Sequence, residues 1–289
     1  MVLIADSGST KCDWILCSPE NKAPIRLKTK GLNPAILSKK QFEKIIFESE
    51  SLAKIKEEVT DIKFFGAGCG TKRNQKKVNA ILGAYFPNAI VYSSEDTMAA
   101  VMATTKTPAV VCILGTGSNC CYFDGRNIHL KAPSMGYLLM DEGSGNYFGK
   151  ELLKAYYYDT MPADLKAVFS ETFNLKEKSV IKGLYKSARP NKYLASFAPF
   201  LFQNEAHPFM KNMLERGMEV FIDNHVLRYR ETLKNVPIHF VGSVAFYGQD
   251  YIKKALKARG VEAGVFVKSP IENIIKDQIN IKQEAYQNT

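Results

Sequence analysis

Two distant segments of the chain share one pattern, in which an apolar strand, a short turn of glycine and hydroxyl residues, and a second strand follow each other. The first segment, VLIADSGSTKCDWIL, begins at residue 2, and the second, VVCILGTGSNCCYF, begins at residue 110. Gly8-Ser9 in the first matches Gly117-Ser118 in the second. Because the repeat is too widely spaced for a solenoid, it predicts two related halves, each built on a hairpin.

The first half continues as alternating helices and strands. Ser38 and Gln41 have the spacing of a capping box and predict a helix that begins there, with apolar residues recurring as far as Ile55. Further elements are expected at strands 25–30, 61–65 and 89–92, in a basic amphipathic helix that ends near Phe86, and in a small-residue helix from Glu95 toward Thr105. This order is typical of an α/β layer arrangement.

The second half is expected to open with strands 109–114 and 120–123, to be mainly helical over 145–235, and to return to a strand at 238–241. A turn at Gly242-Ser243-Val244 and a helix from Gln249 toward Ala258 follow, and residues 271–287 form a last predicted helix. At 289 residues the chain is long enough for two domains. We expect an N-terminal α/β lobe over 1–105, joined by the C-terminal helix 272–289, and a C-terminal α/β lobe over 106–271.

Composition limits the class of protein. The net charge is +10, from 39 Lys and Arg against 29 Asp and Glu. The densest basic run, Lys72-Arg73 with Lys76-Lys77, has no interleaved aromatic residues, and it indicates a solvated helix face rather than a nucleic-acid site. The six cysteines form no CxxC pair and predict buried, reduced thiols in a cytoplasmic protein. No signal-peptide pattern and no membrane-spanning apolar run is found.

The turns predict anion binding. Glycine and hydroxyl residues let backbone N–H groups converge on an anion, and two such turns would hold one polyphosphate from both sides. Asp6, at the end of the first strand, would repel these phosphates unless a cation lay between, and Mg²⁺ fits that place. Two alternatives stay open: each turn is an ordinary glycine hairpin, and Asp6 caps its own turn.

Three segments together resemble a known superfamily: Asp6 with Gly8-Ser9-Thr10, then Gly115–Asn119, then Gly242-Ser243-Val244. They resemble the first phosphate, second phosphate and adenosine motifs of the actin, Hsp70 and sugar kinase superfamily. Within it, the chain is most similar to N-acetylglucosamine kinase and the related BadF/BadG/BcrA/BcrD group. The resemblance implies a two-lobed actin-like ATPase (ribonuclease H-like) α/β fold, with the nucleotide in the interdomain cleft and with ATP and Mg²⁺ as cofactors.

The resemblance also assigns roles to single residues. It places Mg²⁺ at Asp6, through water, and a catalytic carboxylate at Asp96 in SSEDTMAAVMA. It assigns ATP binding to Gly8, Ser9, Thr10, Lys11, Gly117, Ser118, Asn119, Gly242 and Ser243. The alternative for Glu95 and Asp96 is that they merely occupy the positive end of a helix.

Substrate contacts follow from the same resemblance. The segment MGYLLMDEGSGNYFG resembles the family's sugar-binding stretch, and with GLNPAIL it assigns substrate binding to Asn33, Thr116, Gly136 and Asp141. Met140 stands where the family has glycine, and Met135 where it has tryptophan. The alternatives are a helix N-terminal pair for Asp141-Glu142 and a turn residue for Asn33.

The predicted function is therefore ATP-dependent phosphorylation of a sugar or amino sugar, with N-acetylglucosamine or a close relative as substrate. The alternatives are an ATPase that activates a partner enzyme, as acyl-CoA dehydratase activators do, and a nucleotide-dependent regulator. The expected partners are the small-molecule sugar and ATP, with no nucleic acid and no membrane. A homodimer is left open.

Overall fold

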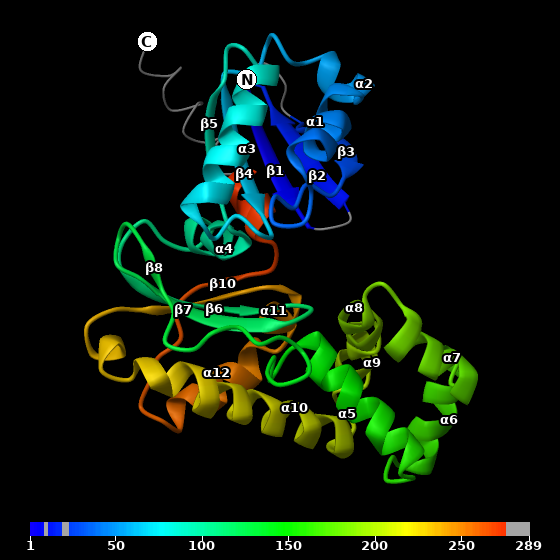
Figure 1. Cartoon of the computed structure of the whole chain (residues 1–289). Helices are drawn as coiled ribbons and strands as arrows, with labels where there is room; N and C mark the ends of the chain where they lie inside the picture. The colour runs from blue at the N-terminus through cyan, green and yellow to red at the C-terminus, as the bar shows by residue number, and fades with distance from the viewer. Residues whose placement is uncertain (9–10, 19–22, 276–289) are drawn as a thin grey trace. The chain divides into compact units, whose positions relative to one another are not determined.

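The computed structural model describes residues 1–8, 11–18 and 23–275. They divide into two compact units (Figure 1). Unit 1 consists of Met1–Ala103 and of the segment that begins at Pro270, and unit 2 consists of Thr104–Ser269. Among the described residues, no helix combines the length and the apolar character that crossing a bilayer would require.

Unit 1 contains a five-stranded sheet in which antiparallel and parallel pairing meet at the first strand. The strand order is β3 (Ile25–Lys30), β2 (Lys11–Cys17), β1 (Val2–Ser7), β4 (Asp61–Gly66) and β5 (Ile90–Ser94). β1, β2 and β3 pair antiparallel, whereas β4 pairs parallel with both β1 and β5. The carboxyl ends of β1, β4 and β5 therefore lie at one edge of the sheet.

The helices of unit 1 are α1 (Lys39–Phe47), α2 (Glu50–Ala53), α3 (Lys72–Tyr85) and α4 (Asp96–Met102). The predicted capping box is confirmed: Ser38 Oγ accepts a hydrogen bond from the Gln41 amide, and the Ser38 amide donates to Gln41 Oε1. The expected continuous helix toward Ile55 is wrong, because α1 ends at Phe47 and α2 is a separate short helix. α1 and α3 pack against each other beside the sheet (Figure 1).

Unit 2 repeats this topology. Its strand order is β10 (Phe266–Val267), β9 (Ile238–Val241), β6 (Ala109–Leu114), β7 (Ser118–Phe123) and β8 (Ile128–His129). β6, β7 and β8 pair antiparallel, and β9 pairs parallel with both β6 and β10. Reading from β8 to β10 reproduces the order from β3 to β5, which confirms that the two hairpins belong to related halves. The sequence did not predict the two-residue strands β8 and β10.

Most of unit 2 between its sheet strands is helical, as predicted. The helices are α5 (Gly145–Tyr157), α6 (Ala163–Thr172), α7 (Glu177–Ile181), α8 (Pro190–Ala195), α9 (Ala198–Gln203), α10 (Pro208–Phe221), α11 (Ser243–Tyr247) and α12 (Gln249–Lys257), with short π turns at Lys182–Lys186 and Ile222–Val226 and 3₁₀ turns at Leu227–Tyr229 and Thr232–Lys234. α5, α10 and α12 run along one side of the sheet in Figure 1. Phe148, Phe221 and Phe240 are fully buried in the core between these helices and the sheet.

Both units bury their thiols. All six cysteines are free and buried, which confirms the expectation of buried thiols. Burial, followed by the charges of Asp96 and Glu95, raises the pKa of Cys69 to about 12. The thiol is therefore protonated at neutral pH, and it is a packing group rather than a nucleophile.

The predicted C-terminal helix begins within the described residues. Residues 270–275 are helical, and Ile271, Ile274 and Ile275 are buried. The remainder of the expected helix, 276–289, lies outside the described residues.

The basic run of α3 differs from its prediction at one residue. Lys72, Arg73 and Lys76 are exposed, as expected of a solvated face. Lys77 is half-buried instead, and its Nζ donates hydrogen bonds to the carbonyl oxygens of Pro34 and Leu37 at 2.9 and 2.6 Å. The interpretation of the whole run as one solvated face is therefore wrong for Lys77, whose partners are distant in sequence.

Gly242, which follows β9, lies close to the end of β6, and this close approach can be tested by mutation. It has φ +115°, and a Cβ there would lie 2.3 Å from the Leu114 carbonyl oxygen. Gly242→Ala is therefore expected to lower the free energy of unfolding in urea by about 2 kcal/mol or more. Gly83→Ala in α3 is the matched control, since its Cβ would meet no atom within 4 Å, and it should raise that free energy by about 0.5–1 kcal/mol. Equal stability of Gly242→Ala and wild type would contradict this geometry.

Candidate active site

The carboxyl edge of the unit 1 sheet gathers two predicted carboxylates, Asp6 and Asp96, and a glycine that was not assigned to the site from the sequence. Asp6 is exposed near the end of β1, in register with Asp13 of β2 and Phe65 of β4. Gly68 follows β4, and Asp96 begins α4 directly after β5. Because β1, β4 and β5 are parallel, the pairing of the strands brings these groups to the same edge.

The hairpin turn of unit 1 closes at Gly8, whose amide donates to the Lys11 carbonyl oxygen at 3.0 Å. Lys11 is exposed, and its ammonium group pairs with Asp13. Ser9 and Thr10, two of the predicted phosphate contacts, lie outside the described residues. An exposed carboxylate beside a glycine turn fits the donors that Mg²⁺ uses together with phosphate oxygens.

Asn33 begins a compact loop at the same sheet edge. It is 7% exposed, and its Oδ1 accepts a hydrogen bond from the Ala35 amide at 2.9 Å. Gly68 has φ +84°, and a Cβ there would come within 2.1 Å of Asn33 Oδ1. Glycine at position 68 therefore leaves room for the Asn33 amide. The Asn33 side chain therefore closes the turn through its Oδ1.

Glu95 and Asp96 lie at the start of α4. Asp96 is exposed, and its Oδ1 accepts from the Thr97 amide at 3.0 Å. Glu95 is half-buried, and burial and the nearby Asp96 charge raise the pKa of its carboxyl. Of the two carboxylates, Asp96 is therefore the more exposed to a hydroxyl group that arrives from solvent.

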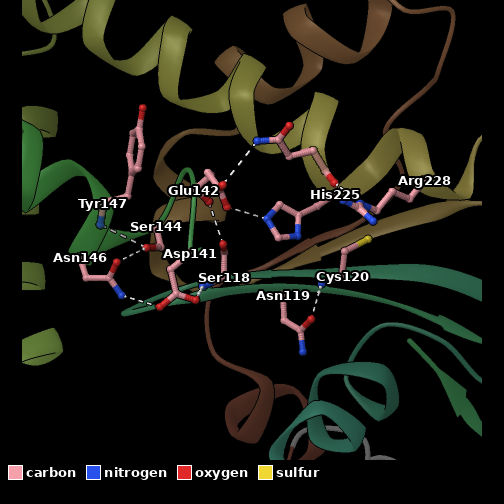
Figure 2. A network of polar contacts seen from close by, with 11 residues as sticks. Ser118, Asn119, Cys120, Asp141, Glu142, Ser144, Asn146, Tyr147, His225 and Arg228 are labelled. Atoms are coloured by element: carbon pink, nitrogen blue, oxygen red, sulfur yellow. Dashed lines mark hydrogen bonds and ion pairs between the residues drawn. The ribbon is translucent and has the colours of Figure 1, made fainter. Parts of the chain in front are cut away.

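Asp141 is the centre of a polar network in unit 2 (Figure 2). Its Oδ1 accepts from the Ser118 amide at 3.2 Å, and its Oδ2 accepts from Asn146 Nδ2 at 2.8 Å. A Cβ at Gly117 would lie 2.7 Å from Asp141 Oδ2. The buried carboxylate thus takes the space that a side chain at position 117 would need, and it holds the 115–118 turn.

The same turn is bound to the start of α5. The amides of Gly145 and Asn146 donate to the carbonyl oxygens of Gly115 and Thr116 at 2.8 and 3.0 Å. Ser144 Oγ caps α5 by accepting from the Tyr147 amide at 3.3 Å. Three of the predicted ligand residues, Thr116, Gly117 and Ser118, therefore form one rigid group with Asp141.

Glu142 ties this group to the π turn that follows α10. His225 Nε2 lies 2.8 Å from Glu142 Oε2, and Ser118 Oγ donates to the Glu142 carbonyl oxygen at 2.8 Å (Figure 2). Burial raises the pKa of Glu142, but hydrogen bonds, of which that with His225 is the strongest, outweigh burial and leave the pKa below its usual value. Glu142 is therefore ionised, and it links the turn at Ser118 to His225.

Two other predicted residues lie apart from the turn network. Asn119 Oδ1 accepts from the Cys120 amide at 2.8 Å, so its side chain is folded back on its own strand. Gly136, at φ +73°, accepts from the Met140 amide at 2.8 Å and forms the bend that leads to Asp141. Met135, before it, is 53% exposed.

A pocket of about 580 Å³ adjoins the turn of unit 2. Gly115 and Thr116 line it from the hairpin, and Ser243 and Val244 line it from the turn after β9. Its other walls are Gly145, Ala195, Ala198, Pro199, Phe202, Gln203 and Tyr247. The pocket is mainly apolar and aromatic, with a few polar groups, which is the character of a small-molecule site.

The wall from Ala195 to Gln203 was not predicted. Its sequence signal is Gly145 and Gly149, four residues apart on α5. A Cβ at Gly149 would lie 1.8 Å from the Leu194 carbonyl oxygen, and one at Gly145 would lie 3.1 Å from Ala195 Cβ. This glycine pair lets α8 approach α5 closely, and α8 and α9 thereby reach the pocket.

Comparison with known proteins supports the same fold. No family model matches the chain, and no curated protein matches it. The solved structure of a proposed N-acetylglucosamine kinase from Porphyromonas gingivalis is 31% identical and has a TM-score of 0.84, over 97% of this chain and 99% of that one.

Two more distant structures show the fold alone. A proposed N-acetylglucosamine kinase from Chromobacterium violaceum is 12% identical with a TM-score of 0.67, over 95% of this chain and 97% of that one. A ROK family glucokinase from Streptomyces griseus, in complex with glucose and AMPPNP, is 12% identical with a TM-score of 0.54, over 93% of each chain. The predicted α/β actin-like ATPase fold is thereby confirmed.

The ionised Glu142 carboxylate predicts that the free energy of unfolding depends on pH. Because its folded-state pKa lies below the ordinary 4.5, the carboxylate stabilises the fold above that pH, and this contribution is lost as the pH falls through the folded-state value. In urea unfolding, Glu142→Gln should be less stable than wild type at neutral pH, and the difference should shrink as the pH falls below the ordinary carboxyl pKa of 4.5. Glu177→Gln, at an exposed carboxylate, should follow wild type. A constant difference between Glu142→Gln and wild type would exclude this role of the ionised carboxylate.

Proposed function

The chain belongs to the N-acetylglucosamine kinase-like family of the actin, Hsp70 and sugar kinase superfamily, and on that premise we propose that it is an ATP-dependent sugar kinase. It transfers the γ-phosphoryl group of ATP to a hydroxyl of a sugar or amino sugar, and N-acetylglucosamine or a close relative is the proposed substrate. The observation that carries this proposal is the pocket of unit 2. It is lined on one side by the glycine turn at Gly115-Thr116 and on another by the aromatic side chains of Phe202 and Tyr247.

In this proposal the pocket binds adenosine. Phe202 and Tyr247, whose ring centres are 6.1 Å apart, supply aromatic surface for the base. Gly242 lets its backbone lie against Leu114 and Gly115, and Ser243 lines the pocket. The Gly117 amide is proposed to face the phosphates, as glycine turns do for anions, and Ser118, whose amide and hydroxyl donate to Asp141 and Glu142, holds that turn in place.

Unit 1 supplies the other phosphate turn and the proposed base. Gly8 and Lys11 are the described parts of that turn, and Asp6 would hold Mg²⁺ through water. When bound, the ion neutralises charge on the transferred phosphoryl group. Asp96 is proposed to accept the proton of the attacking sugar hydroxyl, since its carboxylate is exposed at the carboxyl edge of the sheet.

The first proposed sugar contact is the Asp141 carboxylate. Each Asp141 oxygen makes one hydrogen bond within the network, and a carboxylate oxygen has two lone pairs. Asn33, Thr116 and Gly136 are the further proposed contacts. A buried hydroxyl-binding group of this kind discriminates strongly against analogues without the hydroxyl.

The burial of the cysteines favours a kinase over an activator ATPase. An iron–sulfur cluster shared between subunits needs thiolates at a surface, and all six cysteines of this chain are buried. The deciding experiment is ADP release from Mg-ATP with N-acetylglucosamine, glucosamine, glucose and N-acetylmuramic acid in turn. Turnover with one sugar supports the proposal. ATP binding without turnover on any of them would favour an activator or a regulator instead.

The proposed base gives a direct test. Asp96→Asn should lower sugar-dependent ADP release by about 10²- to 10⁴-fold, because the amide cannot accept the hydroxyl proton. The neighbouring Glu95→Gln is the matched control and should retain most activity. Wild-type turnover in Asp96→Asn would show that the proton goes elsewhere.

The adenosine pocket gives a second test. Gly115 lines the pocket, and a Cβ there meets no atom within 4 Å. Gly115→Ala therefore places a methyl group in the pocket without a clash in the protein. We expect the KM for ATP to rise about tenfold or more, while urea stability and the KM for the sugar stay near wild type. An unchanged KM for ATP would place the nucleotide elsewhere.

A further inference from the structure

Lys77 is a basic residue of α3 that is committed to a neighbouring loop. Its ammonium group donates to the Pro34 and Leu37 carbonyl oxygens at 2.9 and 2.6 Å. The bonds join residues about 40 positions apart in the chain. Lys72, Arg73 and Lys76 on the same helix are exposed, so solvation of a charged face does not account for the position of Lys77.

The loop that Lys77 holds is the one that begins at Asn33. The Asn33 carbonyl oxygen accepts from the amides of Ile36 and Leu37 at 3.2 and 3.0 Å, and its Oδ1 accepts from the Ala35 amide at 2.9 Å. These bonds close the turn around Asn33. The carbonyl groups of Pro34 and Leu37 accept from Lys77 instead.

Two further contacts fix the start of the loop. The Leu32 amide donates to Ser7 Oγ at 2.9 Å, which ties the loop to β1. Gly68 lies against the Asn33 amide, since a Cβ at position 68 would come within 2.1 Å of Oδ1. Ser7 and Gly68 thus hold the entry to the loop, and Lys77 holds its middle and its end.

We propose that Lys77 is a positioning residue for substrate binding: it holds the Asn33 loop in its closed form before the sugar arrives. The inference rests on the proposed function in one respect, the assignment of Asn33 as a sugar contact. An ordered loop binds without the entropy cost of ordering it, and an ammonium group with three donors suits a loop that presents two carbonyl oxygens. Lys77 does not touch the sugar in this scheme.

The test compares Lys77→Met, which keeps an apolar stem of similar length, with Lys76→Met on the same helix as the matched control. For the sugar that turns over, Lys77→Met should raise the KM about tenfold, and the KM for ATP should change by less than about twofold. Lys77→Arg, which retains the donors, should restore most of the affinity. Lys76→Met should match wild type in both constants.

A second readout does not depend on turnover. Hydrogen exchange of the Ile36 and Leu37 amides, followed by mass spectrometry on the free protein, should be about tenfold faster in Lys77→Met and unchanged in Lys76→Met. Wild-type exchange in Lys77→Met overturns the proposal. So does faster exchange without a rise in the sugar KM, when Asn33→Ala does raise it.

The outcome for Asn33→Ala separates the two levels of inference. If Asn33→Ala leaves the sugar KM at its wild-type value, the assigned substrate contact is wrong, and Lys77 has no substrate to position. If no sugar turns over at all, the proposed function fails, while the exchange measurement still decides whether Lys77 holds the loop.

Discussion

Each unit depends on one pairing: the first strand of a hairpin also lies beside a strand that runs parallel to it. In unit 1 these strands are β1 and β4, and in unit 2 they are β6 and β9. The hairpin turn and the segment after the parallel strand must then emerge at the same edge of the sheet. This geometry brings Asp6 and Gly68 to one edge, and the Gly115–Gly117 turn and Gly242 to the corresponding edge of the other unit.

The two edges are stabilised by groups of opposite charge. In unit 1, the cation Lys77 donates hydrogen bonds to two carbonyl oxygens of the Asn33 loop. In unit 2, the Ser118 amide faces inward, and the anion Asp141 satisfies it. Both solutions follow from the same requirement, that buried or half-buried backbone groups find partners. Both edges also need a glycine, because a Cβ at Gly68 would displace the Asn33 side chain and one at Gly117 would displace Asp141.

How far the sequence predicts this molecule depends on the range of the interaction. Local signals suffice for both hairpins, for the Ser38 cap and for the turn at Gly242, because alternation, capping residues and glycine act within a few positions. Lys77 and the wall from Ala195 to Gln203 escape prediction, since their partners are distant in sequence. Even the pair Gly145 and Gly149 predicts only that another element packs closely against α5, and it does not identify that element.

Asp141 has a backbone conformation, φ 71°, that costs most residues with a side chain about 1–2 kcal/mol, and aspartate and asparagine less. Replacement by glycine would relieve that cost while removing the carboxylate, and replacement by asparagine would keep both the shape and the cost. The two variants thus separate the cost of the backbone conformation from the contribution of the carboxylate, whereas an alanine substitution changes the side chain and the backbone cost at once. A glycine variant that unfolds at the same temperature as wild type would still have lost the group that shapes the turn, so thermal stability is a poor measure of what this residue contributes.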